Sequence, residues 1–147
     1  MTGQVAWTTP ADPGFAAVAA LFDEYRTHYG EPPDVEATLA WLTGQVTAGR
    51  LRVAAAADLG FVTTAVLPAS LTLGEAWLVR DLYVPARARR RGVARALLTH
   101  VVEAARAAGA RRVSLQTETG NAPALALYAA AGFRPVTGLE MLNLPLG

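Results

Sequence analysis

Apolar residues recur along this chain at two different spacings. Phe15, Val18, Ala19, Phe22 and Tyr25 stand three or four positions apart, which places them on one face of a helix. Capping and stop residues then set the expected bounds of four helices. These are predicted from the Asp12–Pro13 cap to near Gly30, from the Asp34 cap to about Ala48, from Arg91 to Ala108, and from the Asn121 cap to Ala131.

Short apolar runs bounded by turn residues predict strands. We expect strands at Gln4–Thr8, Arg52–Ala57, Phe61–Leu67, Glu75–Val84, Arg112–Thr117, Phe133–Val136 and Leu139–Leu146, with a loop at Pro68–Gly74. Strands and helices in this order predict a mixed α/β sheet with helices on its faces. The 147 residues contain no repeat, linker or low-complexity tract, so we expect one domain covering 1–147.

Composition excludes several classes of chemistry. The chain has no Cys, which rules out disulfides, a thiol nucleophile and a cysteine metal cluster. With only His28 and His100, we expect no histidine metal site. No apolar run is long enough to span a bilayer, and residues 1–12 lack the pattern of a signal peptide. A cytoplasmic protein without a membrane partner is therefore expected.

Charge is unevenly distributed along the chain. Residues 1–79 carry three Arg against eight Asp and Glu, whereas residues 80–112 carry nine Arg against Asp81 and Glu103. The positive block coincides with a predicted strand, an arginine-rich loop and the start of a helix. Unpaired N–H groups and the positive end of the dipole make a helix start suitable for phosphate. Gly92 and the small Ala94 would let a ligand approach the backbone closely.

A nucleic-acid partner is the other reading of this basic block. The arginines lie on one loop and turn, without interleaved aromatic residues or a recognition-helix pattern. We therefore expect a small phosphate-bearing ligand and no nucleic acid.

Two motifs carry a resemblance to a known family. Arg89-x-x-Gly92-x-Ala94, preceded by Asp81-Leu82-Tyr83-Val84-Pro85, resembles the acetyl-CoA-binding motif of the GNAT N-acetyltransferases. Asn121-x-x-Ala124-x-x-Leu127-Tyr128-x-x-x-Gly132-Phe133 resembles the family's second signature, a short helix beneath the cofactor thiol. The resemblance implies a mostly antiparallel sheet, splayed open between the parallel strands Glu75–Val84 and Arg112–Thr117, with the cofactor entering the opening.

The resemblance also implies how acetyl-CoA is held. Backbone N–H groups of the α-helix start would cradle the pyrophosphate, and Arg87 or its neighbours would add ionic contacts. The backbone of Leu82, Tyr83 and Val84 would pair with the pantetheine arm. The full set of expected cofactor-binding residues is Leu82, Tyr83, Val84, Arg89, Arg90, Arg91, Gly92, Val93, Ala94, Arg95, Asn121, Ala124 and Tyr128.

Catalytic roles are assigned on the same basis. Tyr128 is the candidate general acid, because a phenol stays protonated at neutral pH and can protonate the departing thiolate. Its alternative role is that of a packed aromatic residue. Asp81 and Glu75 are the candidate bases, and on an unbulged strand both would face the same side. The alternative for Asp81 is an ion pair with a neighbouring Arg.

The sequence thus predicts an N-acetyltransferase that moves acetyl from acetyl-CoA to a primary amine by direct attack. The alternative is a non-catalytic acyl-CoA-binding or sensing domain. Tyr25 and Tyr29, at the end of the first helix, are the candidate acceptor-binding residues. The acidic N-terminal half would attract a cationic acceptor. The apolar segment Leu139–Leu146 could pair or exchange across a homodimer.

Overall fold

The computed structural model describes residues 4–147. The chain divides into two compact units, Met1–Gln116 and Thr117–Gly147. The first unit contains the whole sheet and three of the helices, and the second contains one helix followed by an extended segment. Among residues 4–147, no helix is long and apolar enough to cross a bilayer.

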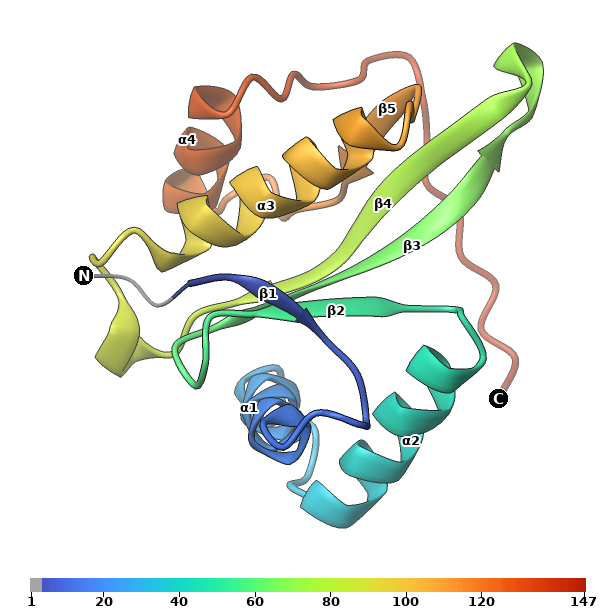
Figure 1. Ribbon diagram of the computed structural model, residues 1–147. Coiled ribbons are helices and arrows are strands. Elements are labelled where there is room, and N and C mark those ends of the chain that lie inside the picture. Colours follow the sequence, from blue (N-terminus) through green and yellow to red (C-terminus); the bar gives the residue numbers. More distant parts are fainter. Residues whose placement is uncertain (1–3) are drawn as a thin grey trace. The chain divides into compact units, whose positions relative to one another are not determined.

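A five-stranded sheet forms the first unit, in the order β1-β2-β3-β4-β5 (Figure 1). The strands are β1 (Ala6–Thr8), β2 (Arg52–Ala55), β3 (Phe61–Ala69), β4 (Gly74–Tyr83) and β5 (Arg112–Leu115). Neighbours from β1 to β4 pair antiparallel, and β5 pairs parallel to β4. The mixed, mostly antiparallel sheet is therefore confirmed, including the parallel pair that the resemblance implied.

Helices cover both faces of this sheet. Figure 1 shows α1 (Phe15–His28) and α2 (Val35–Thr47) on one face and α3 (Val93–Ala107) on the other. The residues of α1 at helical spacing are buried against β2 and β3, and Phe22 stacks on Phe61 with ring centroids 5.1 Å apart. The buried side of α3 consists of Val93, Leu97, Leu98, Val101 and Ala105. Apolar periodicity thus predicted which helix faces are buried.

A buried carboxylate joins α1 to α2. Asp23 accepts hydrogen bonds from the Thr38 hydroxyl at 2.7 Å, from Arg26 Nη1 at 2.8 Å and from the Asp34 backbone N–H at 3.1 Å. The hydrogen bond from Thr38 lowers the pKa of Asp23 most, and those from Asp34 and Arg26 lower it further. Together they outweigh burial, which acts to raise this pKa. The Arg26 side chain is therefore held at this junction between the two helices.

Two local predictions are wrong. Asp12 does not cap α1: the helix begins after Gly14, and Asp12 accepts a hydrogen bond from the Thr9 N–H at 2.7 Å instead. The Asp12–Pro13 pair forms a turn because its carboxylate is used by the residues before it.

Pro68 lies inside β3 and pairs with Glu75, so the predicted loop shrinks to the 3-10 turn Ser70–Thr72 and Leu73.

The second unit also differs from expectation after its helix. Asn121 caps α4 (Ala122–Ala130) as predicted, but neither Phe133–Val136 nor Leu139–Leu146 forms a strand. Pro135 and Pro145 lack the N–H that a ladder needs, and Gly138 has a φ of +82°. The apolar side chains of this segment are exposed, Leu142 to 88% and Leu146 to 94%.

Candidate active site

The strands β4 and β5 pair over a short stretch and then part. Their register runs from Ala76 opposite Arg112 to Val79 opposite Leu115. Beyond Val79, β4 continues to Tyr83 paired with β3 alone. Within residues 4–116, no strand covers the other edge of Arg80–Tyr83, so the sheet opens here as the resemblance implied. This edge includes the backbone of Leu82 and Tyr83, two residues expected to bind the cofactor arm.

The loop after β4 is held in a compact, strained shape. A 3-10 turn covers Ala86–Ala88, and the Ala88 N–H donates to the Pro85 carbonyl at 2.9 Å. Arg89 Nε donates to the Val84 carbonyl at 3.2 Å, so this predicted cofactor-binding side chain also braces the loop. Arg90 and Gly92 both have positive φ, +65° and +74°. Left-handed backbone is costly for a residue with a Cβ, and such strain is concentrated at functional sites.

The loop leads into an uncapped helix start. Gly92 is the N-cap of α3, and no side chain of residues 4–147 caps this end. The first bond inside the helix runs from the Ala96 N–H to the Gly92 carbonyl at 3.0 Å, so the N–H groups of Val93, Ala94 and Arg95 have no partner within the helix. These donors and the positive end of the helix dipole suit an anion such as a phosphate.

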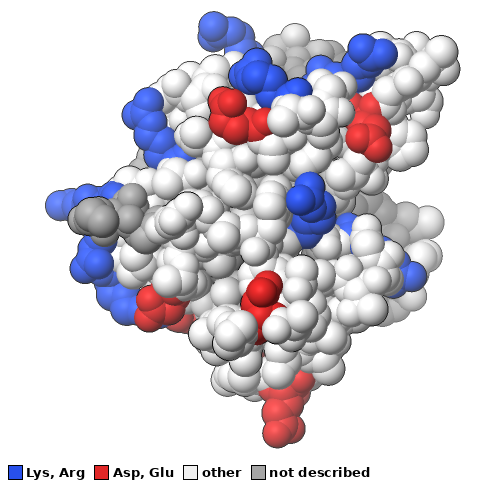
Figure 2. Space-filling model, viewed as in Figure 1, with Lys and Arg blue, Asp and Glu red and all other residues white. Residues whose placement is uncertain are grey.

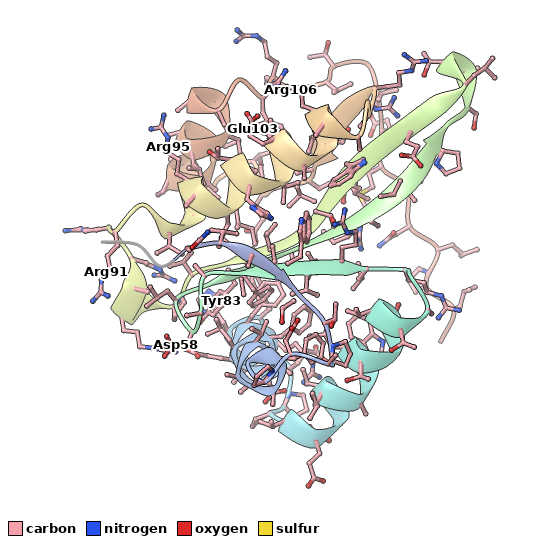
Figure 3. The ribbon with its side chains drawn as sticks, viewed as in Figure 1. Asp58, Tyr83, Arg91, Arg95, Glu103 and Arg106 are labelled. Atoms are coloured by element: carbon pink, nitrogen blue, oxygen red, sulfur yellow. The ribbon has the colours of Figure 1, made fainter. Side chains whose placement is uncertain are left out.

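Arginine side chains surround this helix start. Arg89, Arg90, Arg91 and Arg95 are all exposed. Figure 2 shows positive side chains gathered along its left edge, over the loop and the first turns of α3. Figure 3 labels Arg91 and Arg95, whose side chains extend away from the backbone into solvent. Positive charge therefore lies beside the free N–H groups, as a phosphate-bearing ligand requires.

A β-bulge in β4 separates the two candidate bases. Asp81 pairs with Thr63, and Val79 pairs with the next residue, Thr64, which leaves Arg80 as the extra residue. Adjacent residues of β3 face opposite sides, so Asp81 faces the side opposite to Val79 and, with it, Glu75. Six strand residues also place Glu75 about 20 Å from Asp81. The expectation that both carboxylates share one side held only for an unbulged strand and is wrong here.

Asp81 faces α1 and is held by two hydroxyl groups. Tyr25 Oη donates to Asp81 Oδ1 at 2.8 Å, and Thr63 Oγ1 donates to Asp81 Oδ2. Burial, and then the negative charge of Asp81, raise the pKa of Tyr25, so its hydroxyl remains the donor at neutral pH. Neither of the two ion pairs found among residues 4–147 involves Asp81. The carboxylate is thus oriented by neutral donors and keeps its charge unpaired.

Aromatic rings line the side of Asp81 that faces α1. The Tyr25 ring contacts the rings of Tyr29 and Tyr83, with centroids 5.3 Å and 5.5 Å apart. His28 contacts Tyr29 at 5.1 Å and Tyr83 at 6.3 Å. We call these four residues, Tyr25, His28, Tyr29 and Tyr83, the aromatic cluster. Tyr83, labelled in Figure 3, is the last residue of β4, so the cluster adjoins the open edge of the sheet. The structure therefore brings both predicted acceptor residues together with Asp81.

The second signature is folded as predicted inside the second unit. The Ala124 N–H donates to Asn121 Oδ1 at 3.3 Å, which confirms the cap and places Ala124 in the first turn of α4. The Tyr128 ring packs edge-on against Phe133, with centroids 6.1 Å apart, and the Phe133 N–H donates to the Tyr128 carbonyl at 3.0 Å. Tyr128 and Phe133, two fixed positions of the motif, thus close the end of this helix together.

Sequence reasoning missed two residues of the first unit. Thr63 donates a hydrogen bond to Asp81. Glu24 accepts a hydrogen bond from Tyr83 and forms an ion pair with Arg87. A hydroxyl inside the apolar run Phe61–Leu67 was a usable signal for Thr63, because a buried polar side chain needs a partner. Glu24 carried no such signal, since exposed acids are common on helices.

Comparison with known proteins agrees with this fold. The family model described as the acetyltransferase (GNAT) family matches residues 15–133, and the chain therefore belongs to that family. The uncharacterized N-acetyltransferase YhfO of Bacillus subtilis (strain 168) is 29% identical over 136 residues, covering 88% of this chain and 91% of that protein.

Solved structures extend the comparison. A crystal structure described as a probable acetyltransferase superposes with a TM-score of 0.88 at 28% identity, covering 97% of each chain. The aminoglycoside acetyltransferase meta-AAC0020, from an uncultured soil metagenomic sample, has a TM-score of 0.77 over 97% of this chain and 95% of its own. At 19% identity it shows the shared fold alone. Family and neighbours together identify an N-acetyltransferase, an enzyme that transfers acetyl to an amine.

Proposed function

We propose that acetyl-CoA is the donor and that its acetyl group passes directly to a primary amine. The open edge of β4, which leads into the uncapped start of α3, is the observation that carries this proposal. A ligand with an amide-containing arm and a pyrophosphate fits such an arrangement, because one part needs backbone partners and the other needs N–H donors. Bound there, acetyl-CoA would supply an activated acetyl thioester.

The chain's own groups would hold this donor at two places. The backbone of Leu82, Tyr83 and Val84 would pair with the arm, although Val84 O already accepts from Arg89. The N–H groups of residues 91–95 would bind the pyrophosphate, with Gly92 leaving the approach clear. The side chains of Arg89, Arg90, Arg91 and Arg95 would add ionic contacts.

Asp81 is the base in this proposal, and Glu75 has no part in it. An alkylammonium has a pKa near 10.4, so about one molecule in a thousand is the free amine at pH 7 and a proton must be accepted. The Asp81 carboxylate is oriented by Tyr25 and Thr63 and forms no ion pair with any of residues 4–147, which supports this role. Glu75 lies near the other end of β4, on the opposite face.

Tyr128 is the proposed general acid, and Asn121 and Ala124 the proposed residues beside the donor. Support comes from the match of this segment to the family's second signature, and from the family model, which runs across the boundary between the two units. We accordingly propose that residues 1–147 act as one acetyltransferase domain. The phenol would give its proton to the sulfur as the thiolate leaves.

Tyr25 and Tyr29 are the proposed acceptor-binding residues, joined by Tyr83 and His28 in the aromatic cluster. Aromatic faces attract cations, and Asp81 supplies a negative charge beside them, which favours a cationic amine. The cytoplasmic location, the lack of a nucleic-acid partner and the homodimer stay predictions from the sequence.

Release of the CoA thiol from acetyl-CoA tests this function. The assay would compare primary amines with their trimethylated counterparts, which carry the same charge but cannot be acetylated. We expect release only with one class of primary amine. Acetyl-CoA binding without release would support the acyl-CoA-binding alternative, and a chain that does not bind acetyl-CoA would overturn the site assignment.

A further inference from the structure

Glu24 connects the aromatic cluster to the basic loop. This α1 carboxylate accepts a hydrogen bond from Tyr83 Oη at 3.3 Å. It also forms an ion pair with Arg87, whose Nη1 lies 3.1 Å from Oε1 and 3.4 Å from Oε2. Arg87 belongs to the turn Ala86–Ala88, inside the loop that leads to the anion-binding start of α3. One carboxylate is thus shared between the two halves of the proposed site.

Two carboxylates flank one pair of tyrosine rings. Tyr25 and Tyr83 are in ring contact at 5.5 Å, yet their hydroxyls donate to different acids, Tyr25 to Asp81 and Tyr83 to Glu24. In the part of the chain that the structure describes, Asp81 has no ion-pair partner, whereas Glu24 has Arg87 as its partner. The aromatic cluster therefore adjoins two negative charges, one unpaired and one neutralised.

The ion pair on Glu24 is easily exchanged. The side chains of Arg87 and Glu24 are 58% and 42% exposed, and an ion pair in such surroundings contributes little to stability. A phosphate group carries more charge than a carboxylate and binds guanidinium strongly. Phosphates bound at the start of α3 would therefore compete with Glu24 for Arg87.

We propose that Glu24 is a specificity-determining residue of the acceptor site: it is neutralised by Arg87 until the donor's phosphates engage that arginine, and then binds a second positive charge of the acceptor. The acceptor class is a diamine, with one nitrogen at Asp81 and the other at Glu24. This inference rests on the proposed function and adds to it the acceptor class and the residue that selects it.

Matched amines test the acceptor class. Putrescine and cadaverine carry two charges, whereas n-butylamine and n-pentylamine have the same chains with one charge each. We expect kcat/KM for thiol release to be about fivefold higher with each diamine, the factor that one partly exposed ion pair supplies. Glu24→Gln should bring the ratio between diamine and monoamine close to one. Glu31→Gln, which removes the same charge at an exposed position just beyond α1, should keep the wild-type ratio.

Calorimetry with putrescine tests the exchange at Arg87. Without any donor, Arg87→Gln should bind putrescine about fivefold more tightly than the wild type, because Glu24 is then unpaired. Arg106→Gln, with the same charge change at an exposed position in the last turn of α3, serves as the control and should bind as the wild type does.

Several outcomes would overturn the inference. A diamine preference that survives Glu24→Gln, or putrescine affinities that are equal in the Arg87 and Arg106 variants, would remove Glu24 from the acceptor site. Equal rates with diamines and monoamines would overturn the inference and leave the proposed function standing. No thiol release from acetyl-CoA with any primary amine would overturn the proposed function itself, and this inference with it.

Discussion

The Tyr25 hydroxyl donates a 2.8 Å hydrogen bond to Asp81 and so connects α1 to the C-terminal end of β4. This contact depends on the bulge at Arg80, which turns Asp81 toward α1 instead of toward α3. Thr63, on the neighbouring strand, holds the other carboxylate oxygen. The proposed base is therefore fixed in direction by two strands and a helix.

Tyr25→Phe tests whether this contact serves catalysis. The ring and its packing remain, but Asp81 loses a donor, so we expect kcat to fall about tenfold or more with little change in acetyl-CoA affinity. In an Asp81→Asn background the same change should have a much smaller effect, because residues that act through one contact are not additive. Steady-state kinetics of the four proteins gives the answer. Equal effects of Tyr25→Phe in both backgrounds would separate Tyr25 from Asp81.

Gly92→Glu tests the anion site. A carboxylate at the start of α3 would repel phosphates and occupy their place, and we expect acetyl-CoA affinity to fall by at least about a hundredfold. Gly109→Glu is the matched control, because Gly109 follows the other end of α3 with nearly the same φ, +75° against +74°. Both variants share the backbone strain and the added charge, and calorimetry compares them. Similar losses in both would show that Gly92 matters for folding alone.

Tyr128→Phe tests the proposed acid. The ring contact with Phe133 is retained, so α4 should stay folded while the proton donor is lost. We expect kcat to fall by about a hundredfold, within the range for general acid catalysis, and the acetyl-CoA dissociation constant to change by less than about twofold. A kcat equal to that of the wild type would exclude Tyr128 from the reaction.

Asp23 makes the stability of the first unit depend on pH. Its pKa in the folded chain is lowered below the ordinary value of 3.8, chiefly by the Thr38 hydrogen bond. A lowered pKa contributes stability that is fully present above the ordinary value and is lost as the pH falls through the folded-state pKa. Urea midpoints measured from pH 6 downward should therefore fall steeply near and below pH 4 in the wild type, and less steeply in Asp23→Asn.

Asp58→Asn is the control for that titration, since Asp58 is exposed on the turn between β2 and β3. It should follow the wild-type curve. An Asp23→Asn curve that runs parallel to the wild type at every pH would show that Asp23 contributes no pH-dependent stability.

The features that follow from short-range rules were predictable from the sequence. Asp34 and Asn121 cap their helices through their own side chains, and Gly92 adopts the positive φ that only glycine adopts without strain. The four helices and the first five strands were likewise predictable, from the spacing of apolar residues. These signals act within a few residues, and no distant partner changes them.

The remaining features depend on distant partners. The bulge at Arg80 exists because β3 and β4 pair with one residue in excess, which neither strand shows alone. Asp12 is an exception, because its partner is local: it resembles a helix cap, but it accepts a hydrogen bond from Thr9, three residues before it. The segment Leu139–Leu146 has the composition of a strand. A strand also needs a neighbouring strand to pair with, which composition cannot supply, and these residues form no strand. The same limit hid the contacts of Thr63 and Glu24.

Backbone amide exchange measured with and without acetyl-CoA would locate the donor on the chain. We expect acetyl-CoA to slow exchange at residues 82–84 and 91–95, the open edge of β4 and the start of α3. The amides of Ala76 and Trp77, near the N-terminal end of β4, should exchange at the same rate in both conditions, because these residues already pair with β3 on one side and β5 on the other. Bound acetyl-CoA that protects other amides and leaves 82–84 and 91–95 unchanged would contradict the proposed site.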